Sequence, residues 1–194
     1  YPIRENSRSK RTELSSGGKI VEQGWAIWIT GLPASGKSTI ASNLIDILQK
    51  ENVQVQVLES DELRDVLTPN PTYNPRERDV FYNSMVYIGT LLADNGVNVI
   101  FDAVANRREW RDKARENIDR FMEVYVDTPL EVCKERDPKG IYEKAKKGEA
   151  TTVPGVQAEY EKTKDPEVTV DGTTHPQESA EKIVRAMRKN GYIS

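Results

Sequence analysis

The chain has 194 residues, and its 28 basic and 31 acidic side chains give a formal net charge of −3. This length suits one domain of the usual ~100–200 residues, no apolar run reaches the ~18 residues of a membrane span, and no basic block marks a nucleic-acid surface. A single cysteine, Cys133, excludes an internal disulfide and favours a reducing, cytoplasmic location.

The organised part of the chain is predicted to begin after a polar N-terminal segment. Residues 1–24 include a Ser-Ser-Gly-Gly run, which predicts an arm or linker before a single domain over 25–194. Short apolar runs then alternate with segments of helical periodicity. In chain order these predict a strand over 25–30, a helix over 37–50, a strand over 53–58, a helix over 61–67, a long helix from 75 to about 94, a strand over 97–101, a helix over 107–117, a strand over 121–126, a strand over 167–170 and a helix over 176–189.

Two helix start signals support this division. Asn74 as N-cap, Pro75 at the first helical position and Glu77 as the third residue predict the start of the long helix. The run Thr128-Pro129 followed by Glu131 repeats the signal. The Asn95-Gly96 pair is typical of a helix end.

Strands that alternate with helices in this way predict an α/β fold. We expect a three-layer sandwich with a central five-stranded parallel sheet covered on both faces, because right-handed crossovers place helices on each side. Residues 136–164 do not fit the alternation; they are rich in lysine and broken by glycine and proline. A long basic excursion of this kind predicts a lid over the site.

A phosphate loop joins the first strand to the first helix. The run Gly31-Leu32-Pro33-Ala34-Ser35-Gly36-Lys37-Ser38 fits G-x-x-x-x-G-K-[ST] in the required strand-loop-helix context. Its glycines let backbone N–H groups converge on phosphate oxygens, and the helix N-terminus adds partial positive charge. Lys37 is expected to reach the β- and γ-phosphates of ATP, and Ser38 to ligate Mg²⁺. The fold is therefore predicted to be of the P-loop NTPase or kinase type.

The remaining motifs narrow the kind of nucleotide protein. No guanine-reading Asn-Lys-x-Asp is present, which argues against a GTPase switch, and the chain is short for a motor or transport ATPase. A small kinase, or a binding domain that has lost catalysis, remains.

Two acidic residues are candidates for the chemistry. Asp61 follows the second strand, where a carboxylate could orient or deprotonate an acceptor hydroxyl; it could also be a helix N-terminal acid. Asp102 ends an apolar strand and could bind Mg²⁺, or could be an ordinary polar strand end.

Four arginines follow the carboxyl ends of predicted strands, where an anionic acceptor would lie. A planar guanidinium suits phosphate or sulfate, although for each arginine taken singly a solvated helix face is the better explanation. They are Arg64, Arg78, Arg108 and Arg111.

Three segments resemble adenylylsulfate kinase (APS kinase): the phosphate loop, Leu58–Arg64 and the Arg-Asp-Pro-Lys-Gly-Ile-Tyr run that begins at Arg136. The similarity extends from about residue 19 to the C-terminus. It implies a P-loop kinase that uses Mg-ATP to phosphorylate the 3′-hydroxyl of adenosine 5′-phosphosulfate (APS), giving PAPS in sulfate activation. It also implies a homodimer, and allows fusion to or association with ATP sulfurylase.

The resemblance also assigns roles to individual residues. Lys37 and Asp61 would be catalytic. The metal assignment comes from the residues themselves: Ser38 of the phosphate loop would hold Mg²⁺, with Asp102 at the end of its strand as a partner. ATP would contact Gly31, Leu32, Pro33, Ala34, Ser35, Gly36, Lys37, Ser38, Thr39 and Arg136. The acceptor would contact Asp61, Arg64, Tyr73, Arg78, Phe81, Val104, Ala105, Lys139 and Val153.

Departures from the family pattern fall mostly on the acceptor side. Phe81 stands where an asparagine is usual, Val104-Ala105-Asn106 replaces Ile-Ser-Pro, and Val153 replaces an adenine-stacking phenylalanine. Asp102 replaces a small residue, and Glu59-Ser60 replaces Asp-Gly before Asp61. Two alternatives therefore stay open: a kinase for another nucleotide- or sugar-linked hydroxyl, and a non-catalytic nucleotide-sensing domain of a sulfurylase.

Overall fold

The structure is a computed structural model that describes residues 22–194. The predicted arm over residues 1–24 therefore lies outside the described residues except for its last three positions. The strands are β1 (Ala26–Thr30), β2 (Gln56–Glu59), β3 (Val99–Asp102), β4 (Phe121–Asp127) and β5 (Val168–Asp171). The helices are α2 (Lys37–Lys50), α3 (Ser60–Leu67), α4 (Pro75–Asp94), α5 (Arg108–Asn117), α6 (Leu130–Arg136), α7 (Ile141–Lys146) and α8 (Pro176–Lys189).

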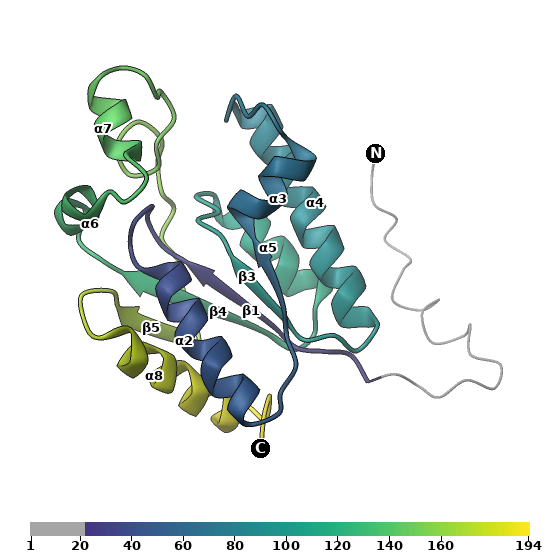
Figure 1. Ribbon diagram of the computed structural model, residues 1–194. Helices are drawn as coiled ribbons and strands as arrows, with labels where there is room; N and C mark the ends of the chain where they lie inside the picture. The colour runs from purple at the N-terminus through teal and green to yellow at the C-terminus, as the bar shows by residue number, and fades with distance from the viewer. Residues whose placement is uncertain (1–21) are drawn as a thin grey trace.

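The five strands form one parallel sheet in the order β2-β3-β1-β4-β5, with β1 at its centre. Helices α2 and α8 cover one face, and α4 and α5 cover the other (Figure 1). The predicted three-layer α/β sandwich is confirmed. None of the helices in the described part of the chain has the length and apolar character that a bilayer span requires.

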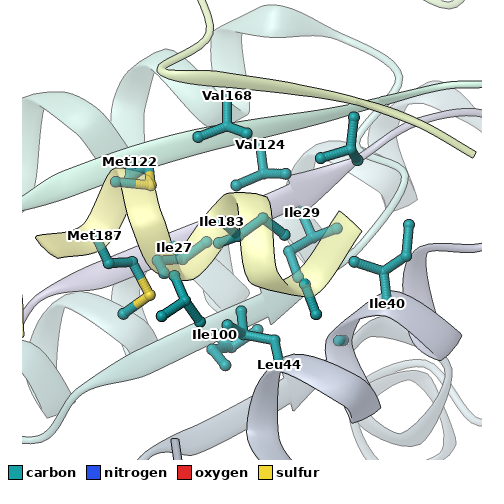
Figure 2. Packing of buried hydrophobic residues seen from close by; sticks show 14 of the residues in the cluster. Ile27, Ile29, Ile40, Leu44, Ile100, Met122, Val124, Val168, Ile183 and Met187 are labelled. Carbon is teal, nitrogen blue, oxygen red and sulfur yellow. The ribbon is translucent and has the colours of Figure 1, made fainter. Parts of the chain in front are cut away.

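The alternating side chains of β1 divide the core into two layers, because successive residues of a strand point to opposite faces. Ile27 and Ile29 face α2 and α8, where they pack with Leu44 and Ile183 (Figure 2). All four side chains are fully buried. Burying each such side chain stabilises the fold by about 1.5–3 kcal/mol.

The second layer is aromatic and places α4 very close to the sheet. Trp28 of β1 stacks on Phe101 of β3 with ring centroids 4.6 Å apart, and its indole N–H donates to the Ala103 carbonyl. Gly89 of α4 lies directly over the Phe101 ring, where an added Cβ would be 2.1 Å from Cζ. Glycine is therefore required here by close approach, and not by backbone conformation.

Of the two predicted helix start signals, the one at α4 is present in the structure and the one at α6 is not. At α4 the Asn74 side chain accepts from the Glu77 N–H at 2.9 Å as predicted, but the Glu77 carboxylate accepts from the N–H groups of Thr72 and Tyr73. At α6 the predicted Thr128 cap is wrong. The Thr128 hydroxyl donates instead to the Ser35 carbonyl at 2.9 Å, which ties the end of β4 to the phosphate loop.

The parallel register brings the functional segments together. Ile29 of β1 and Glu59 of β2 both pair with Asp102 of β3, so these strands end at the same level. The phosphate loop, the start of α3 and Asp102 consequently meet at one edge of the sheet, where ligands bind in open α/β folds. Helices α6 and α7 lie beyond this edge (Figure 1).

Replacing Gly89 with alanine tests this packing, because two effects predict opposite signs. An exposed helical glycine-to-alanine change stabilises by up to about 1 kcal/mol. At Gly89 we expect destabilisation of roughly 1–3 kcal/mol, since the methyl group must displace a ring already stacked on Trp28. Urea unfolding measures the difference, with Ser84→Ala on the same helix as the control. A stabilised Gly89→Ala variant would contradict the close contact of α4 with β3.

Candidate active site

The phosphate loop folds tightly between β1 and α2. Gly36 has φ 101°, a left-handed conformation that favours glycine. At Gly31 the reason is space, since a Cβ would lie 2.7 Å from the Val126 carbonyl oxygen and 2.8 Å from Ser35 Oγ. The α2 helix begins at Lys37, with Ser38 and Thr39 exposed in its first turn. The loop thus presents a helix N-terminus and two exposed hydroxyl groups, which is the geometry that binds a phosphate.

Lys37 lies inside this loop and not in solvent. Its side chain is 8% exposed, and Nζ donates to the Leu32 carbonyl at 2.7 Å and to Ser35 Oγ at 3.5 Å. Burial lowers the pKa of the ammonium to about 8, while the nearby Asp102 carboxylate opposes that change. The cation is therefore short of negative partners, and a polyphosphate would supply them.

Asp102 and Ser38 form the candidate metal site. The Asp102 side chain is buried at the end of β3 and shares a hydrogen bond with the Ser38 side chain. Burial raises the pKa of the Asp102 carboxyl, and the Lys37 ammonium limits the rise. Among residues 22–194 there is no cluster of three or more acidic, histidine or cysteine side chains that could hold a metal. One hydroxyl and one carboxylate nevertheless fit Mg²⁺, which takes its other ligands from substrate phosphates and water.

Asp61 lies in the first turn of α3, and its carboxylate pairs with Lys139 of the lid. Both side chains are more than half exposed, at 57% and 58%. The carboxylate of Glu59 lies near this pair, and burial beside Asp102 and Asp61 raises its pKa. An acid that is free enough to exchange its lysine partner for a substrate hydroxyl suits the acceptor side.

Arg64 is a buried guanidinium enclosed by aromatic rings. It lies 3.8 Å from the centroid of Phe81 and 4.9 Å from that of Tyr73, and it faces the Glu77 carboxylate at 3.7 Å. Its Nη1 atom is buried without a hydrogen-bond partner. A buried donor left unpaired is costly, so this group is suited to an anion that enters the site. Phe81 itself is fully buried beneath Arg64.

Arg78 is held by three separate segments. Its Nε donates to the Tyr73 carbonyl at 2.9 Å, Nη1 to Asn106 Oδ1 at 3.0 Å, and Nη2 to the Thr152 carbonyl at 2.7 Å. Tyr73, which has a left-handed φ of 55°, is 40% exposed beside it. These residues line a cavity of about 500 Å³. A larger cavity of about 850 Å³ lies around Trp25 at the other end of the strands, away from the phosphate loop.

The lid packs directly on the phosphate loop. Cys133, Tyr142 and Val153 are buried together and contact the partly buried Leu32 and Ala34. The Tyr142 hydroxyl donates to the Pro33 carbonyl at 2.9 Å. Arg136 Nη1 lies 3.5 Å from the Ser35 carbonyl oxygen, close to the expected ATP position. Val153 is therefore part of the lid core, and it presents little free surface on which a base could stack.

The C-terminal part of the lid is held by a contact between Thr30 and Tyr160, two residues that no sequence motif identifies. Thr30 Oγ1 donates to the Val104 carbonyl at 2.7 Å and shares a 2.9 Å hydrogen bond with the Tyr160 hydroxyl. Neither residue carries a motif. Only their long-range contact identifies them, so no signal in a single sequence would have found them.

Arg111 corrects an expectation. The Arg111 side chain neither faces solvent nor is available to bind an anion, because it is 1% exposed and its Nε donates to Glu123 at 2.7 Å. Its other nitrogens donate to the carbonyls of Ala105 and Glu161. Ala105 is fully buried with a left-handed φ of 39°. Arg111 therefore fixes the backbone at Ala105 and Glu161, and its buried guanidinium is not open to a ligand.

Arg108 also turns toward the lid. Its backbone N–H donates to the Glu161 carboxylate, and its guanidinium donates to the Lys162 carbonyl at 3.1 Å. The arginines after the strand ends thus divide into two kinds. Arg64 Nη1 has no hydrogen-bond partner and faces the Glu77 carboxylate. In contrast, Arg78, Arg108 and Arg111 are hydrogen-bonded to other segments of the protein.

The proposed residues gather in two adjoining groups. The donor group surrounds the phosphate loop, and the acceptor group lies between α3, α4 and the lid. The donor group is Gly31, Leu32, Pro33, Ala34, Ser35, Gly36, Lys37, Ser38, Thr39, Asp102 and Arg136, and the acceptor group is Asp61, Arg64, Tyr73, Arg78, Phe81, Val104, Ala105, Lys139 and Val153.

Comparison with known proteins gives one consistent result. Residues 23–171 match the family model described as adenylylsulphate kinase. A probable adenylyl-sulfate kinase of Pyrococcus abyssi is 38% identical over 172 residues, covering 88% of this chain and 99% of that protein. The adenylyl-sulfate kinase of Lactiplantibacillus plantarum is 36% identical over 97% of this chain and 90% of that protein.

The solved structures agree. The Mycobacterium tuberculosis APS kinase CysC, in complex with AMPPNP and APS, superposes with a TM-score of 0.80 at 32% identity, covering 86% of this chain and 98% of that chain. A sugar kinase from Janibacter is 18% identical with a TM-score of 0.61, and shares the fold alone.

Nucleotide affinity should fall as the pH rises through 8, because the free Lys37 ammonium loses its charge near pKa 8. Below that pH the lysine is protonated and attracts phosphate; above it we expect the affinity to drop by up to about tenfold per pH unit. Equilibrium binding of ATP between pH 7.5 and 9.5 measures this. Lys37→Arg keeps its charge throughout and should give a flat profile relative to its own value at pH 7.5. An equally flat wild-type profile would overturn the assignment.

Proposed function

The chain belongs to the adenylylsulphate kinase family, and we propose that it transfers the γ-phosphoryl group of ATP to the 3′-hydroxyl of APS, giving PAPS and ADP. The observation that carries the proposal is the meeting of two sites at one sheet edge. The phosphate loop with its buried Lys37 lies at the same sheet edge as the start of α3, the helix that carries Asp61 and Arg64, whose Nη1 is buried without a hydrogen-bond partner.

On the donor side the protein supplies fixed positive charge. Phosphoryl transfer needs mainly positioning and charge neutralisation, because the transition state spreads negative charge over the equatorial oxygens. Loop N–H groups and the buried Lys37 would provide that charge. Lys37 must leave the Leu32 carbonyl to reach the phosphate, and this bond is replaced by a stronger charge-assisted one. Thr39 and Arg136 complete the ATP contacts.

Mg²⁺ would be held by the Ser38 hydroxyl, with the Asp102 carboxylate binding it directly or through water. When bound, it neutralises charge on the β- and γ-phosphates. The hydrogen bond between these two side chains supports the assignment, because it brings the Ser38 and Asp102 oxygens close enough to share one ion. Asp102 also keeps the adjacent Lys37 protonated, since its carboxylate raises the lysine pKa.

On the acceptor side Asp61 would orient the 3′-hydroxyl and accept its proton. Its present partner, Lys139, would then move to the anionic groups of the substrate, so that the lysine exchanges one negative partner for another. Arg64 would donate from Nη1 to sulfate or phosphate. Phe81 and Ala105 would act indirectly, since both side chains are fully buried and support Arg64 and the backbone respectively.

Another hydroxyl acceptor is the first alternative. It is favoured by the burial of Phe81 and Val153, which leaves Tyr73 as the exposed aromatic ring of the acceptor group. A non-catalytic sensing domain is the second. The buried Lys37 and its Asp102–Ser38 neighbours weigh against it, because a sensor does not need groups aimed at the γ-phosphate and metal.

We propose a homodimer as the assembly, paired through one face of α4. Val80, Tyr87 and Leu91 are 60%, 69% and 52% exposed, and their spacing places them in one stripe. In an antiparallel pair of α4 helices about a two-fold axis, Val80 would meet Leu91, and Ser84 would meet Tyr87 of the partner. A cytoplasmic location and an attachment to a sulfurylase remain predictions.

A steady-state assay tests the function directly. With ATP and APS we expect PAPS and ADP in equal amounts, a loss of at least about 10³-fold in kcat for Lys37→Ala, and about 10²–10⁴-fold for Asp61→Asn. A panel of sugar and nucleoside acceptors, followed by ADP release, separates the first alternative. Tight PAPS binding with no turnover of any acceptor would favour the sensing domain and refute the kinase.

The dimer face has its own test. Tyr87→Glu should halve the molar mass measured by light scattering, because it places a charge at the centre of the apolar stripe. Val66→Glu, at an even more exposed position on α3, serves as the matched control and should leave the mass unchanged. A monomeric wild type, or an unchanged mass for Tyr87→Glu, would refute pairing through α4.

A further inference from the structure

We infer that Asn106 is a positioning residue. Together with Arg78 it holds the two ends of a turn in the lid, so the orientation of Arg78 is fixed only when this turn packs against Asn106 and the start of α4. The inference deepens the proposed function and rests on it. Its basis is a set of contacts that connects residues 104–106, the start of α4 and the lid.

Asn106 uses both the oxygen and the nitrogen of its side-chain amide. The side chain is buried, Oδ1 accepts from Arg78 Nη1 at 3.0 Å, and Nδ2 donates to the Glu159 carbonyl at 2.8 Å. The Asn106 carbonyl accepts from the Glu161 N–H at 2.8 Å. A flipped amide would turn its NH₂ group toward the guanidinium, so the partners determine the orientation. Only an amide side chain of this length offers both a donor and an acceptor here.

The two ends of the lid turn converge on this side-chain pair. The turn over residues 153–158 is closed by its own backbone: the N–H groups of Gln157 and Ala158 donate to the Val153 carbonyl. Immediately before it, the Thr152 carbonyl accepts from Arg78 Nη2 at 2.7 Å. Immediately after it, the Glu159 carbonyl accepts from Asn106. Arg78 and Asn106 thus hold the turn at both ends.

The same turn also contacts the phosphate loop. Val153 packs in the lid core with Leu32, and a Cβ at Gly155 would lie 2.7 Å from Leu32 Cδ2. A movement of the phosphate loop therefore reaches the turn, and through the turn reaches Arg78 and Asn106. The clamp provides a physical connection between nucleotide binding on one side and the orientation of the acceptor-side arginine on the other.

Most of the N–H donors of Arg78 are already used within the protein. Its guanidinium already serves the carbonyls of Tyr73 and Thr152 as well as Asn106. Loss of Asn106 would free one edge of the guanidinium to rotate, while Nε stays on Tyr73. Hydrogen bonds to charged groups are among the stronger ones, so we expect the acceptor KM to rise about 10- to 100-fold for Asn106→Ala.

The experiment compares Asn106→Ala and Asn106→Asp with Asn117→Ala, a control at the far end of α5. Asn106→Ala should raise the acceptor KM and leave the KM for ATP within about twofold. Asn106→Asp keeps the acceptor for Arg78 but cannot donate to Glu159, so its acceptor KM should stay closer to the wild type. Combining Asn106→Ala with Arg78→Lys should add little to the effect of either change alone.

Limited trypsin digestion of the nucleotide-free protein gives a readout besides activity. Cleavage at the lid lysines 144, 146, 147, 162 and 164 should be severalfold faster in both Asn106 variants than in the wild type and Asn117→Ala. If the wild type does not phosphorylate APS, the proposed function fails while this comparison still tests the clamp. Equal cleavage rates, or an acceptor KM and an ATP KM that rise together with a lowered Tm, would overturn the inference.

Discussion

The site depends on one constraint: an ammonium group is held out of water at the carboxyl end of the central strand. Lys37 is 8% exposed, and its Nζ donates to one carbonyl at 2.7 Å and to Ser35 Oγ at 3.5 Å, with the buried Asp102 carboxylate nearby. Removing a charge from water is expensive unless it is paired, and burial already lowers the lysine pKa to about 8. The parallel register supplies part of the pairing by bringing Asp102 to the level at which β1 ends. A bound polyphosphate would supply the remaining negative charge. Burial of Lys37 destabilises the ligand-free site, and for the same reason it favours nucleotide binding.

The fold and the donor side could be predicted from the sequence because their signals are local. Helices α2 and α8 have the predicted bounds, since apolar periodicity and a start signal coincide there. The phosphate loop is contiguous in the chain, and its chemistry is carried by backbone groups that glycine positions dictate. Strand starts were less accurate: β2 begins at Gln56 and not at residue 53, although Val53 and Val55 do pack on the core. Burial sets the apolar pattern, whereas hydrogen bonding to β3 sets the strand, and the two need not begin together.

The acceptor side could be predicted only through the resemblance, because residues far apart in the chain build it. Arg78 meets Thr152 across 74 positions, and Thr30 meets Tyr160 across 130. Nothing in the local sequence distinguishes Arg111, which is buried on Glu123, from an arginine on a solvated helix face. Polar contacts of this kind have no periodicity. They form only in the folded protein, where the sheet places the strand ends side by side and the lid packs over them.

The departures from the family pattern are physically connected. Asn106 binds Arg78, Arg78 binds the carbonyl of Thr152, and Val153 follows directly in the lid core. Phe81 lies one helical turn from Arg78 and supports Arg64 at 3.8 Å, beside the same Tyr73 whose carbonyl Arg78 holds. A substitution at any of these positions changes the surroundings of the others, because neighbours in one contact network are not energetically independent. The residues proposed for the acceptor side therefore form one connected set of contacts.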